Sequence, residues 1–180
     1  AAATLIQETQ NDDGGWRYKP TPGDADLSVT SAMLIALRSL SAAGVAVQEE
    51  VPQQAIAYIT RLQNEDGGFR YLLEAGPSGA PRTAAALFAL QLAGAEGVVI
   101  DNGFRWLNQH PLRLNSDDGY ALYGLSYSAA ARYQRLLSTH AKNAWEKWYS
   151  RATRMLLEAQ RTDGSWSDPS CSEYGTAAAI

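Results

Sequence analysis

The sequence predicts an all-α fold, an incomplete α/α barrel or toroid built from about four helical hairpins. Three observations support this prediction. A nine-residue phrase occurs three times at wide intervals, apolar residues precede each copy with helical spacing, and a second run rich in alanine follows each copy. A phrase that recurs at such intervals is typical of a repeat protein.

The repeated phrase begins with glutamine and contains an aromatic residue at its seventh position. Its copies cover residues 10–18, 63–71 and 160–168, and the wide gap between the second and third leaves room for a degraded copy near Pro111. The motif residues are Gln10, Gly15, Trp16, Gln63, Gly68, Phe69, Gln160, Gly164 and Trp166. We expect a single domain with repeats near 1–50, 51–97, 98–139 and 140–180.

The segment before each copy has the pattern of an amphipathic helix. Bulky apolar residues stand four and five positions before the phrase, and a small residue stands eight positions before it. The three sets are Ile6, Ile59, Leu107 and Leu156; Leu5, Tyr58, Trp106 and Met155; and Ala2, Ala55, Gly103 and Ala152. This is one face of a helix, and we expect outer helices near 1–10, 51–63, 98–110 and 140–160.

A second helix is predicted after each copy. Thr30 and Thr83 each stand 14 positions after the aromatic residue and precede alanine-rich runs of low charge, as Thr176 does at ten positions. Polar residues suit helix starts, and Gly44 and Gly94 suit left-handed helix ends. We expect inner helices near 28–43, 82–93, 118–137 and from 174 onward. The more charged outer helices surround them, and curvature closes the stacked hairpins toward a toroid.

The repeated phrase resembles the QW motif of squalene-hopene and oxidosqualene cyclases, which the β subunits of protein prenyltransferases share in weaker form. Members of this terpene cyclase and prenyltransferase superfamily adopt an α/α toroid, and the resemblance covers essentially the whole chain. The sequence is also similar to bacterial cyclase-like repeat proteins of unknown role, in which segments such as 26–30, 145–148 and 174–176 recur. The resemblance implies a structural role for the motif glutamine, held at an outer helix end against the aromatic ring, where it ties neighbouring repeats together.

The resemblance also indicates where a catalytic acid would stand. Cyclases of this superfamily protonate an isoprenoid with an Asp-x-Asp-Asp motif, and the matching segment here runs from Asp26 to Thr30, with Ser28 in place of the protonating aspartate. A hydroxyl cannot replace a carboxylic acid whose proton affinity is raised by burial and like charges. We therefore expect no catalytic acid in this segment, with Asp24 in a solvated loop and Asp26 at a helix start.

Metal chemistry is not expected either. Prenyltransferases hold zinc with an Asp-x-Cys pair and a distant histidine. The single cysteine, Cys171, has the wrong spacing from Asp168, and His110 and His140 join no cluster of ligands. Residues 117–119 do not form a diphosphate-metal box and are interpreted as part of a degraded phrase. We expect no metal and no cofactor.

An aromatic stripe is the strongest candidate for a binding face. Tyr120, Tyr123 and Tyr127 recur on one side of the third inner helix, where they could hold a flat apolar ligand or stabilise a cation. The structural alternative is that they pack the ring interior and hydrogen-bond across it. Trp145, Trp148 and Tyr149 form a second candidate patch, which we expect to pack against the preceding inner helix, with an interface as the alternative. The candidate ligand-binding residues are Tyr120, Tyr123, Tyr127, Asp26, Ser28, Thr30 and Thr83.

Composition limits the functional classes. With 180 residues and 46% apolar content the chain can bury a core. A net charge of −4 with scattered cations argues against nucleic acid as a binding partner. The sequence contains no run of 18 apolar residues, so we expect no membrane-spanning segment. Because four hairpins fall short of the about six that close the ring in the family, we expect an open arc or a piece of a longer protein, able to pair with itself or with further repeats.

Two functional hypotheses follow. The first is a cyclase-like toroid module that binds an apolar, isoprenoid-like molecule or a protein in its concave face. The second is an isoprenoid-processing enzyme, similar to a terpene cyclase or prenyltransferase, whose active site is completed by repeats outside this segment. Titratable groups in a dry central cavity favour the enzyme, whereas a cavity filled by tyrosines and alanine-rich helices favours the module.

Overall fold

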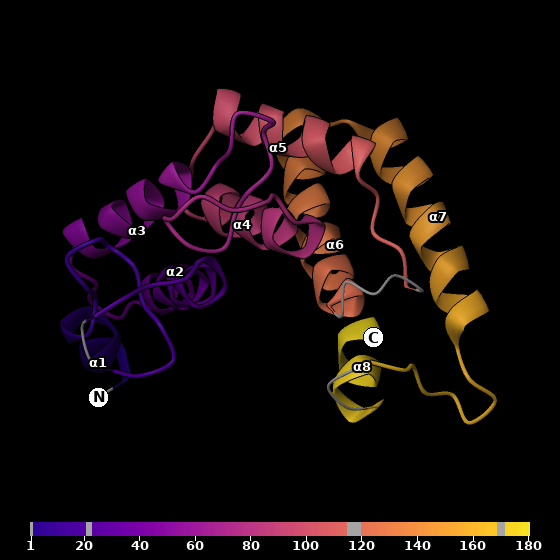
Figure 1. Ribbon diagram of the computed structural model, residues 1–180, viewed down its shortest axis with the longest axis horizontal. Helices are drawn as coiled ribbons and strands as arrows, with labels where there is room; N and C mark the ends of the chain where they lie inside the picture. The colour runs from indigo at the N-terminus through magenta and orange to yellow at the C-terminus, as the bar shows by residue number, and fades with distance from the viewer. Residues whose placement is uncertain (1, 21–22, 115–119, 169–171) are drawn as a thin grey trace.

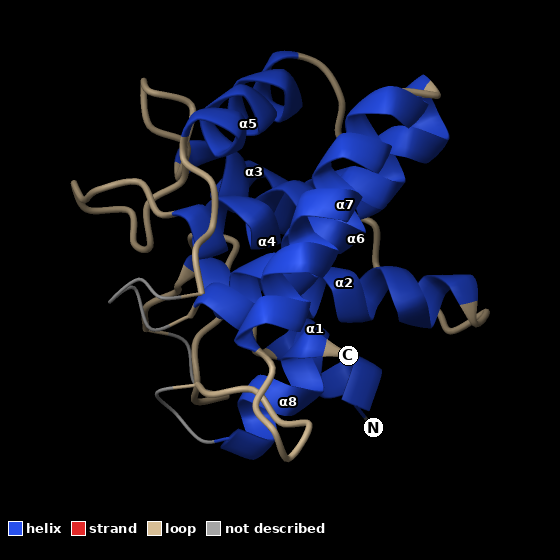
Figure 2. Ribbon diagram, turned by 90° about the vertical axis from the view of Figure 1, so that its right-hand side faces the viewer, coloured by secondary structure: helices blue, strands red, loops and turns tan. Residues whose placement is uncertain are grey.

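The computed structural model describes residues 2–20, 23–114, 120–168 and 172–180, and within them the chain forms eight α-helices and no strand (Figure 2). The helices are α1 (Ala2–Glu8), α2 (Leu27–Ala42), α3 (Glu50–Arg61), α4 (Ala80–Leu92), α5 (Val98–Gln109), α6 (Ala121–Thr139), α7 (Lys142–Ala159) and α8 (Ser172–Ala179). The all-α prediction is confirmed, and the predicted positions agree with the observed helices to within a few residues. No helix in this described part is long and apolar enough to cross a membrane.

The helices form an arch with two layers. Figure 1 shows α2, α4, α6 and α8 following one another along the inside of the arch, while α1, α3, α5 and α7 lie along the outside. The N-terminus and the C-terminus lie at the two feet of the arch (Figure 1). This arrangement of inner and outer helices is compatible with part of an α/α toroid.

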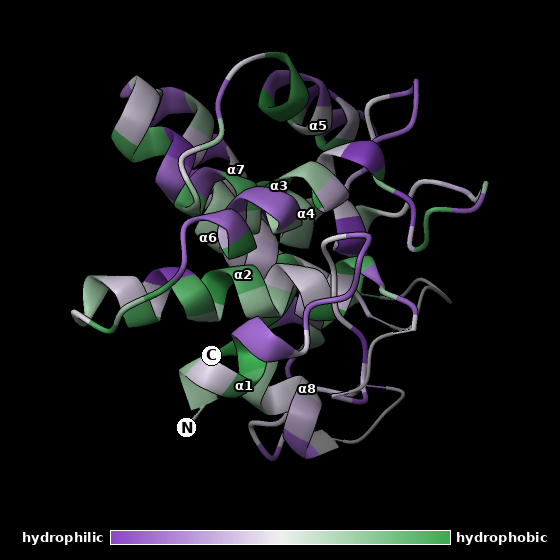
Figure 3. Cartoon of the chain, turned by 90° about the vertical axis from the view of Figure 1, so that its left-hand side faces the viewer, coloured by the Kyte–Doolittle hydropathy of each residue, from purple (hydrophilic) through white to green (hydrophobic). Residues whose placement is uncertain are grey.

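The core is centred on α4, whose residues from Thr83 to Leu87 are fully buried. Its alanine side chains are small, so α2, α5 and α6 can all approach it closely. On α5, a Cβ added at Gly103 would lie 2.7 Å from the Leu87 side chain, which explains why a small residue stands at this position. Hydrophilic residues gather in the loops, whereas α2 is largely apolar or neutral (Figure 3).

The turn after each outer helix has the same backbone hydrogen bonds in all three copies of the phrase. The second residue donates its N–H to the carbonyl of the sixth, in the pairs Asn11–Gly15, Asn64–Gly68 and Arg161–Ser165, over 2.8–3.0 Å. The fifth residue is a glycine with positive φ, namely 91° at Gly14, 91° at Gly67 and 85° at Gly164. Glycine adopts this conformation at little cost, whereas other residues do not.

The motif glutamines connect consecutive outer helices. Gln10 Nε2 donates to the carbonyl of Gly14 at 2.8 Å and to that of Val51, in the first turn of α3, at 2.9 Å. Gln63 repeats this pattern with Gly67 and with Val99 in the first turn of α5, both at 2.9 Å. In the described residues Gln160 keeps only the bond within its own turn, to Gly164 at 2.9 Å.

The motif aromatic residues fix the phrase against the helix that precedes it. The indole N–H of Trp16 donates to the Ile6 carbonyl, and that of Trp166 donates to the Leu156 carbonyl, both at 2.8 Å. Phe69 has no such donor and is fully buried. The phrase is therefore attached to its own outer helix through the aromatic residue and to the next one through the glutamine.

Candidate functional site

The start of α2 holds a buried carboxylate in a structural position. Asp26 is the N-cap of α2, and its Oδ1 accepts a hydrogen bond from the Val29 N–H at 2.9 Å. The side chain is completely buried. Its Oδ2 lies 3.7 Å from Arg17 Nε and has no hydrogen-bond partner of good geometry in the described part of the chain. The carboxylate caps the helix, as expected.

The two candidate threonines are also buried. Thr30 Oγ1 accepts a hydrogen bond from the Trp16 N–H at 3.1 Å, and Thr83 Oγ1 accepts one from the Phe69 N–H at 2.9 Å. Each hydroxyl thus joins the first turn of an inner helix to the preceding phrase, and this explains the constant spacing of 14 residues between the paired positions. Neither hydroxyl is available to a ligand.

The tyrosines of the third inner helix separate into a packed pair and an exposed residue. The rings of Tyr123 and Tyr127 lie 4.7 Å apart between centroids, and the Phe88 ring of α4 lies 6.1 Å from Tyr127. Tyr120 stands at the N-cap of α6 and is 59% exposed. The pair, and not the full stripe, is therefore part of the inner layer.

The Tyr123 hydroxyl, on α6, lies beside the start of α2. It lies close to Ser28 at the start of α2 and to the Tyr127 hydroxyl, yet its oxygen makes no hydrogen bond of good geometry with a described residue. Burial raises the pKa of Tyr123, and the neighbouring Tyr127 raises it further. Burial likewise raises the pKa of Tyr127. Both phenols are therefore neutral in the physiological range.

We call the surface formed by Ser28, Phe88, Tyr123 and Tyr127 the inner aromatic face. Its residues come from three inner helices, α2, α4 and α6. Leu87, one position before Phe88 on α4, meets Gly103 of α5, and α2, α4 and α6 lie along the inside of the arch (Figure 1). Of the seven residues predicted to bind a ligand, the structure places Ser28, Tyr123 and Tyr127 here.

Metal chemistry has no ligand set among the described residues. No group of three or more His, Cys, Asp or Glu side chains in them is arranged to hold a metal ion. His110 stacks on Trp106, with ring centroids 4.1 Å apart, and its Nδ1 lies 2.9 Å from the Trp106 carbonyl oxygen. Cys171 and residues 117–119 lie outside the described residues.

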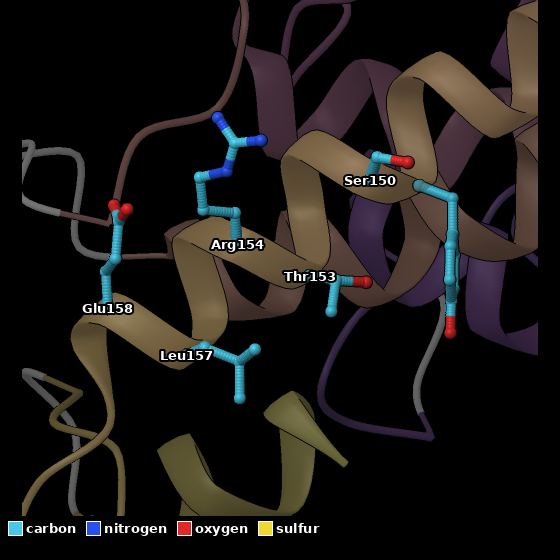
Figure 4. A pocket seen from close by; sticks show the side chains of 6 residues that line it. Ser150, Thr153, Arg154, Leu157 and Glu158 are labelled. Carbon is cyan, nitrogen blue, oxygen red and sulfur yellow. The ribbon is translucent and has the colours of Figure 1, made fainter.

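An open groove runs along α7. It has a volume of about 510 Å³, and in Figure 4 the Arg154 and Glu158 side chains extend above the helix ribbon while Leu157 extends below it. The side chains that line it are Tyr149, Ser150, Thr153, Arg154, Leu157 and Glu158. Leu157 is 65% exposed, and Ala152 is the one buried residue recorded along α7 within the described part of the chain.

The sequence prediction missed two features. Phe88 belongs to the inner aromatic face. It is the aromatic residue in the alanine-rich sequence of α4, and this contrast could have identified it as a candidate. Arg132, together with its aromatic neighbours Phe104 and Trp148, was also missed. Trp148 packs against α6 through this arginine, as expected for its packing partner. That a charged side chain would lie between the two helices was not predicted from the sequence.

Comparison with known proteins shows a distant similarity to a curated protein. No family model matches the sequence. Across 195 aligned positions the chain is 28% identical to drimenyl diphosphate synthase from Streptantibioticus cattleyicolor, and the alignment covers 99% of this chain and 35% of that protein. The chain thus spans about a third of the length of this relative. The similarity is distant, extends over the whole chain, and supports a terpene cyclase-like origin.

Proposed function

We propose that this chain is a cyclase-like α/α toroid module, a single domain of helical hairpins that holds an apolar, isoprenoid-like molecule on the inside of its arch. The observation that carries the proposal is the inner aromatic face, where rings from α4 and α6 pack together beside the start of α2. The whole-length similarity to drimenyl diphosphate synthase supports an isoprenoid as the ligand class.

The chemistry of the inner aromatic face suits such a ligand. Phe88, Tyr123 and Tyr127 are each partly buried and packed against the core, so each ring keeps some apolar surface that a ligand can cover. Burial of apolar area contributes about 25 cal/mol per Å², and a branched hydrocarbon chain has no polar group that must be matched. The faces of aromatic rings also attract positive charge.

The same surface offers no strong acid. Ser28 stands where the cyclase resemblance would place the protonating aspartate, and the neighbouring carboxylate, Asp26, is buried as a helix cap. Tyr123 and Tyr127 are weak acids, and burial raises the pKa of each further. We therefore propose binding without protonation by these residues.

A second candidate is an isoprenoid-processing enzyme whose active site includes residues outside these 180. One observation favours it: the similarity to drimenyl diphosphate synthase covers only about a third of that protein. In this case the inner aromatic face would form one wall of the active site, and the catalytic groups would come from further repeats.

A protein or a second copy as the partner is a third candidate. Gln160 uses one side-chain hydrogen bond among the described residues, whereas Gln10 and Gln63 each use two, the second directed to the next outer helix. A further helix beside α7 could accept the free N–H of Gln160. The groove on α7 lies on this helix.

Binding of farnesol, measured by isothermal titration calorimetry, tests the first proposal. We expect saturable binding that Tyr127→Ala weakens about tenfold, because the substitution removes most of a ring worth about 1.5–3 kcal/mol of contact. Tyr149→Ala is the matched control, since Tyr149 lies on α7 and is 54% exposed. Equal binding by both variants, or no binding by the unaltered chain, would contradict the proposal.

A further inference from the structure

A second cavity lies between α5, the end of α6 and the start of α7. Its volume is about 370 Å³, within the size range of small-molecule sites. A smaller space of about 70 Å³ adjoins it and shares two wall residues, Asn108 and Arg132. We call this region the arginine cleft, and its larger cavity is lined by Phe104, Arg105, Arg132, Arg135 and Trp145 among others.

Arg132 lines the arginine cleft and contacts residues of α5, α6 and α7. Its guanidinium lies 5.7 Å from the Phe104 ring centroid and 5.4 Å from the Trp148 ring centroid. Its Nη2 donates to Asn108 Oδ1 at 3.0 Å, and its Nε donates to Ser128 Oγ at 3.3 Å. These neutral contacts orient the planar group but use only part of its donors.

The positive charge of the arginine cleft is not balanced. Arg135 forms an ion pair with Asp101 at 2.9 Å. Neither Arg132 nor Arg105 has a carboxylate partner within the described residues; Arg105 donates instead to the neutral Asn102 Oδ1 at 2.6 Å. Three arginines and one aspartate line the larger cavity, in a protein whose net charge is −4.

The environment of Arg132 penalises its charge. Burial, and then the nearby charges of Arg151 and Arg135, lower the pKa of Arg132 to about 10. A partly buried charge without an opposite charge beside it is unfavourable. An anion beside Arg132 would relieve this penalty, since a guanidinium offers a pair of parallel donors that matches an oxyanion.

We propose that the arginine cleft binds the phosphate group of a small phosphorylated molecule. The guanidinium of Arg132 supplies the central donors, and the exposed Arg105 adds a further positive charge to the wall of the cavity. Trp145 and Leu136 give the same cavity an apolar wall, which suits a phosphate ester that carries an apolar group better than a free ion.

This site is independent of the inner aromatic face. Arg132 follows Tyr123 by nine residues on α6, and at about 100° per residue this places the two side chains on opposite sides of the helix. Binding at one surface can therefore fail while binding at the other is retained.

Titration calorimetry at low ionic strength tests the proposal with two probes, inorganic pyrophosphate and phenyl phosphate. We expect saturable binding of both, with phenyl phosphate also changing the tryptophan fluorescence, because Trp145 lines the cavity. Arg132→Met should weaken both probes about tenfold or more, since a hydrogen bond to a charged group is lost, and Arg105→Gln should weaken them less.

Arg154→Gln is the matched control, because Arg154 belongs to the separate groove on α7. Thermal unfolding checks that Arg132→Met is folded. If this variant does not fold, the loss of binding in Arg105→Gln still tests the proposal. The proposal is overturned if neither probe saturates, or if Arg154→Gln weakens binding as much as the cleft variants do. If pyrophosphate binds and phenyl phosphate does not, the cleft binds an oxyanion, and the proposal that its ligand carries an apolar group is contradicted.

Discussion

The connection that Gln63 makes between two outer helices can be removed almost without changing shape. Gln63→Met keeps the length of the side chain and deletes both hydrogen bonds from Nε2, to Gly67 and to Val99 at 2.9 Å. Each bond contributes about 1 kcal/mol net. The two carbonyl groups that lose their donor lie in partly buried surroundings, so part of a desolvation cost of about 1–3 kcal/mol is added.

We therefore expect Gln63→Met to lower the free energy of unfolding by about 2–3 kcal/mol, which corresponds to a decrease in Tm of about 5–10 °C. Urea denaturation followed by circular dichroism and by tryptophan fluorescence gives this quantity, provided that the two signals change together.

Gln160→Met is the internal control for this prediction. Gln160 occupies the same position in the third phrase, but with the described residues its side chain makes one hydrogen bond, and that bond is exposed. We expect a loss of about 0.5 kcal/mol or less. If the two variants lose equal stability, the bond to the next outer helix is not what stabilises the phrase, and the reasoning is refuted.

The other predictions concern single positions. Gly67→Ala should lower the free energy of unfolding by about 3 kcal/mol and Gly44→Ala by about 1 kcal/mol, both measured by urea denaturation. Both glycines have positive φ, but of the two only Gly67 would bring an added Cβ against backbone, 2.8 Å from the Asn102 carbonyl oxygen. Equal losses would refute this explanation. Thr83→Val should lower the free energy of unfolding by about 1–3 kcal/mol, because the buried Phe69 N–H loses its acceptor. Thr83→Ser keeps a hydroxyl, and a loss of stability equal to that of Thr83→Val would count against this role. Burial raises the pKa of Tyr58, so its contribution to stability is full below the unfolded pKa of about 10 and declines above it by about 1.4 kcal/mol per pH unit. Tyr58→Phe should flatten this alkaline slope, and an unchanged slope would contradict it.

Much of the fold could be predicted because it depends on local patterns. The spacing of Ile59 and Leu107 before a phrase position defined the outer helices, and both residues are buried. Gly44 and Gly94 were expected at left-handed helix ends, and their φ values are 80° and 86°. Such features depend on residues a few positions apart, which a sequence displays directly.

The contacts that span many residues were harder to predict. The spacing of 14 between Trp16 and Thr30 was visible, but the hydrogen bond that it serves was not. The carbonyl that Gln63 binds belongs to Val99, 36 positions away, and no side-chain pattern marks a backbone acceptor.

The candidate site shows the same limit. Helical spacing placed Tyr123 and Tyr127 on one side of α6 correctly, but it also included Tyr120, which precedes the helix and is exposed. The arginine cleft forms where α5, α6 and α7 meet, and sequence spacing within one helix does not predict such a meeting. Inner helices were expected to carry little charge, and Arg132 on α6 is an exception to that pattern.

Native mass spectrometry of the chain incubated with squalene tests the central claim, that the inner aromatic face holds an isoprenoid-like molecule and does not convert it. We predict one retained squalene of unchanged mass on the unaltered chain, a much smaller bound fraction for Tyr127→Ala, and no loss for the exposed control Tyr149→Ala. Absence of retained squalene, equal retention by Tyr127→Ala, or the appearance of a converted product would contradict the claim.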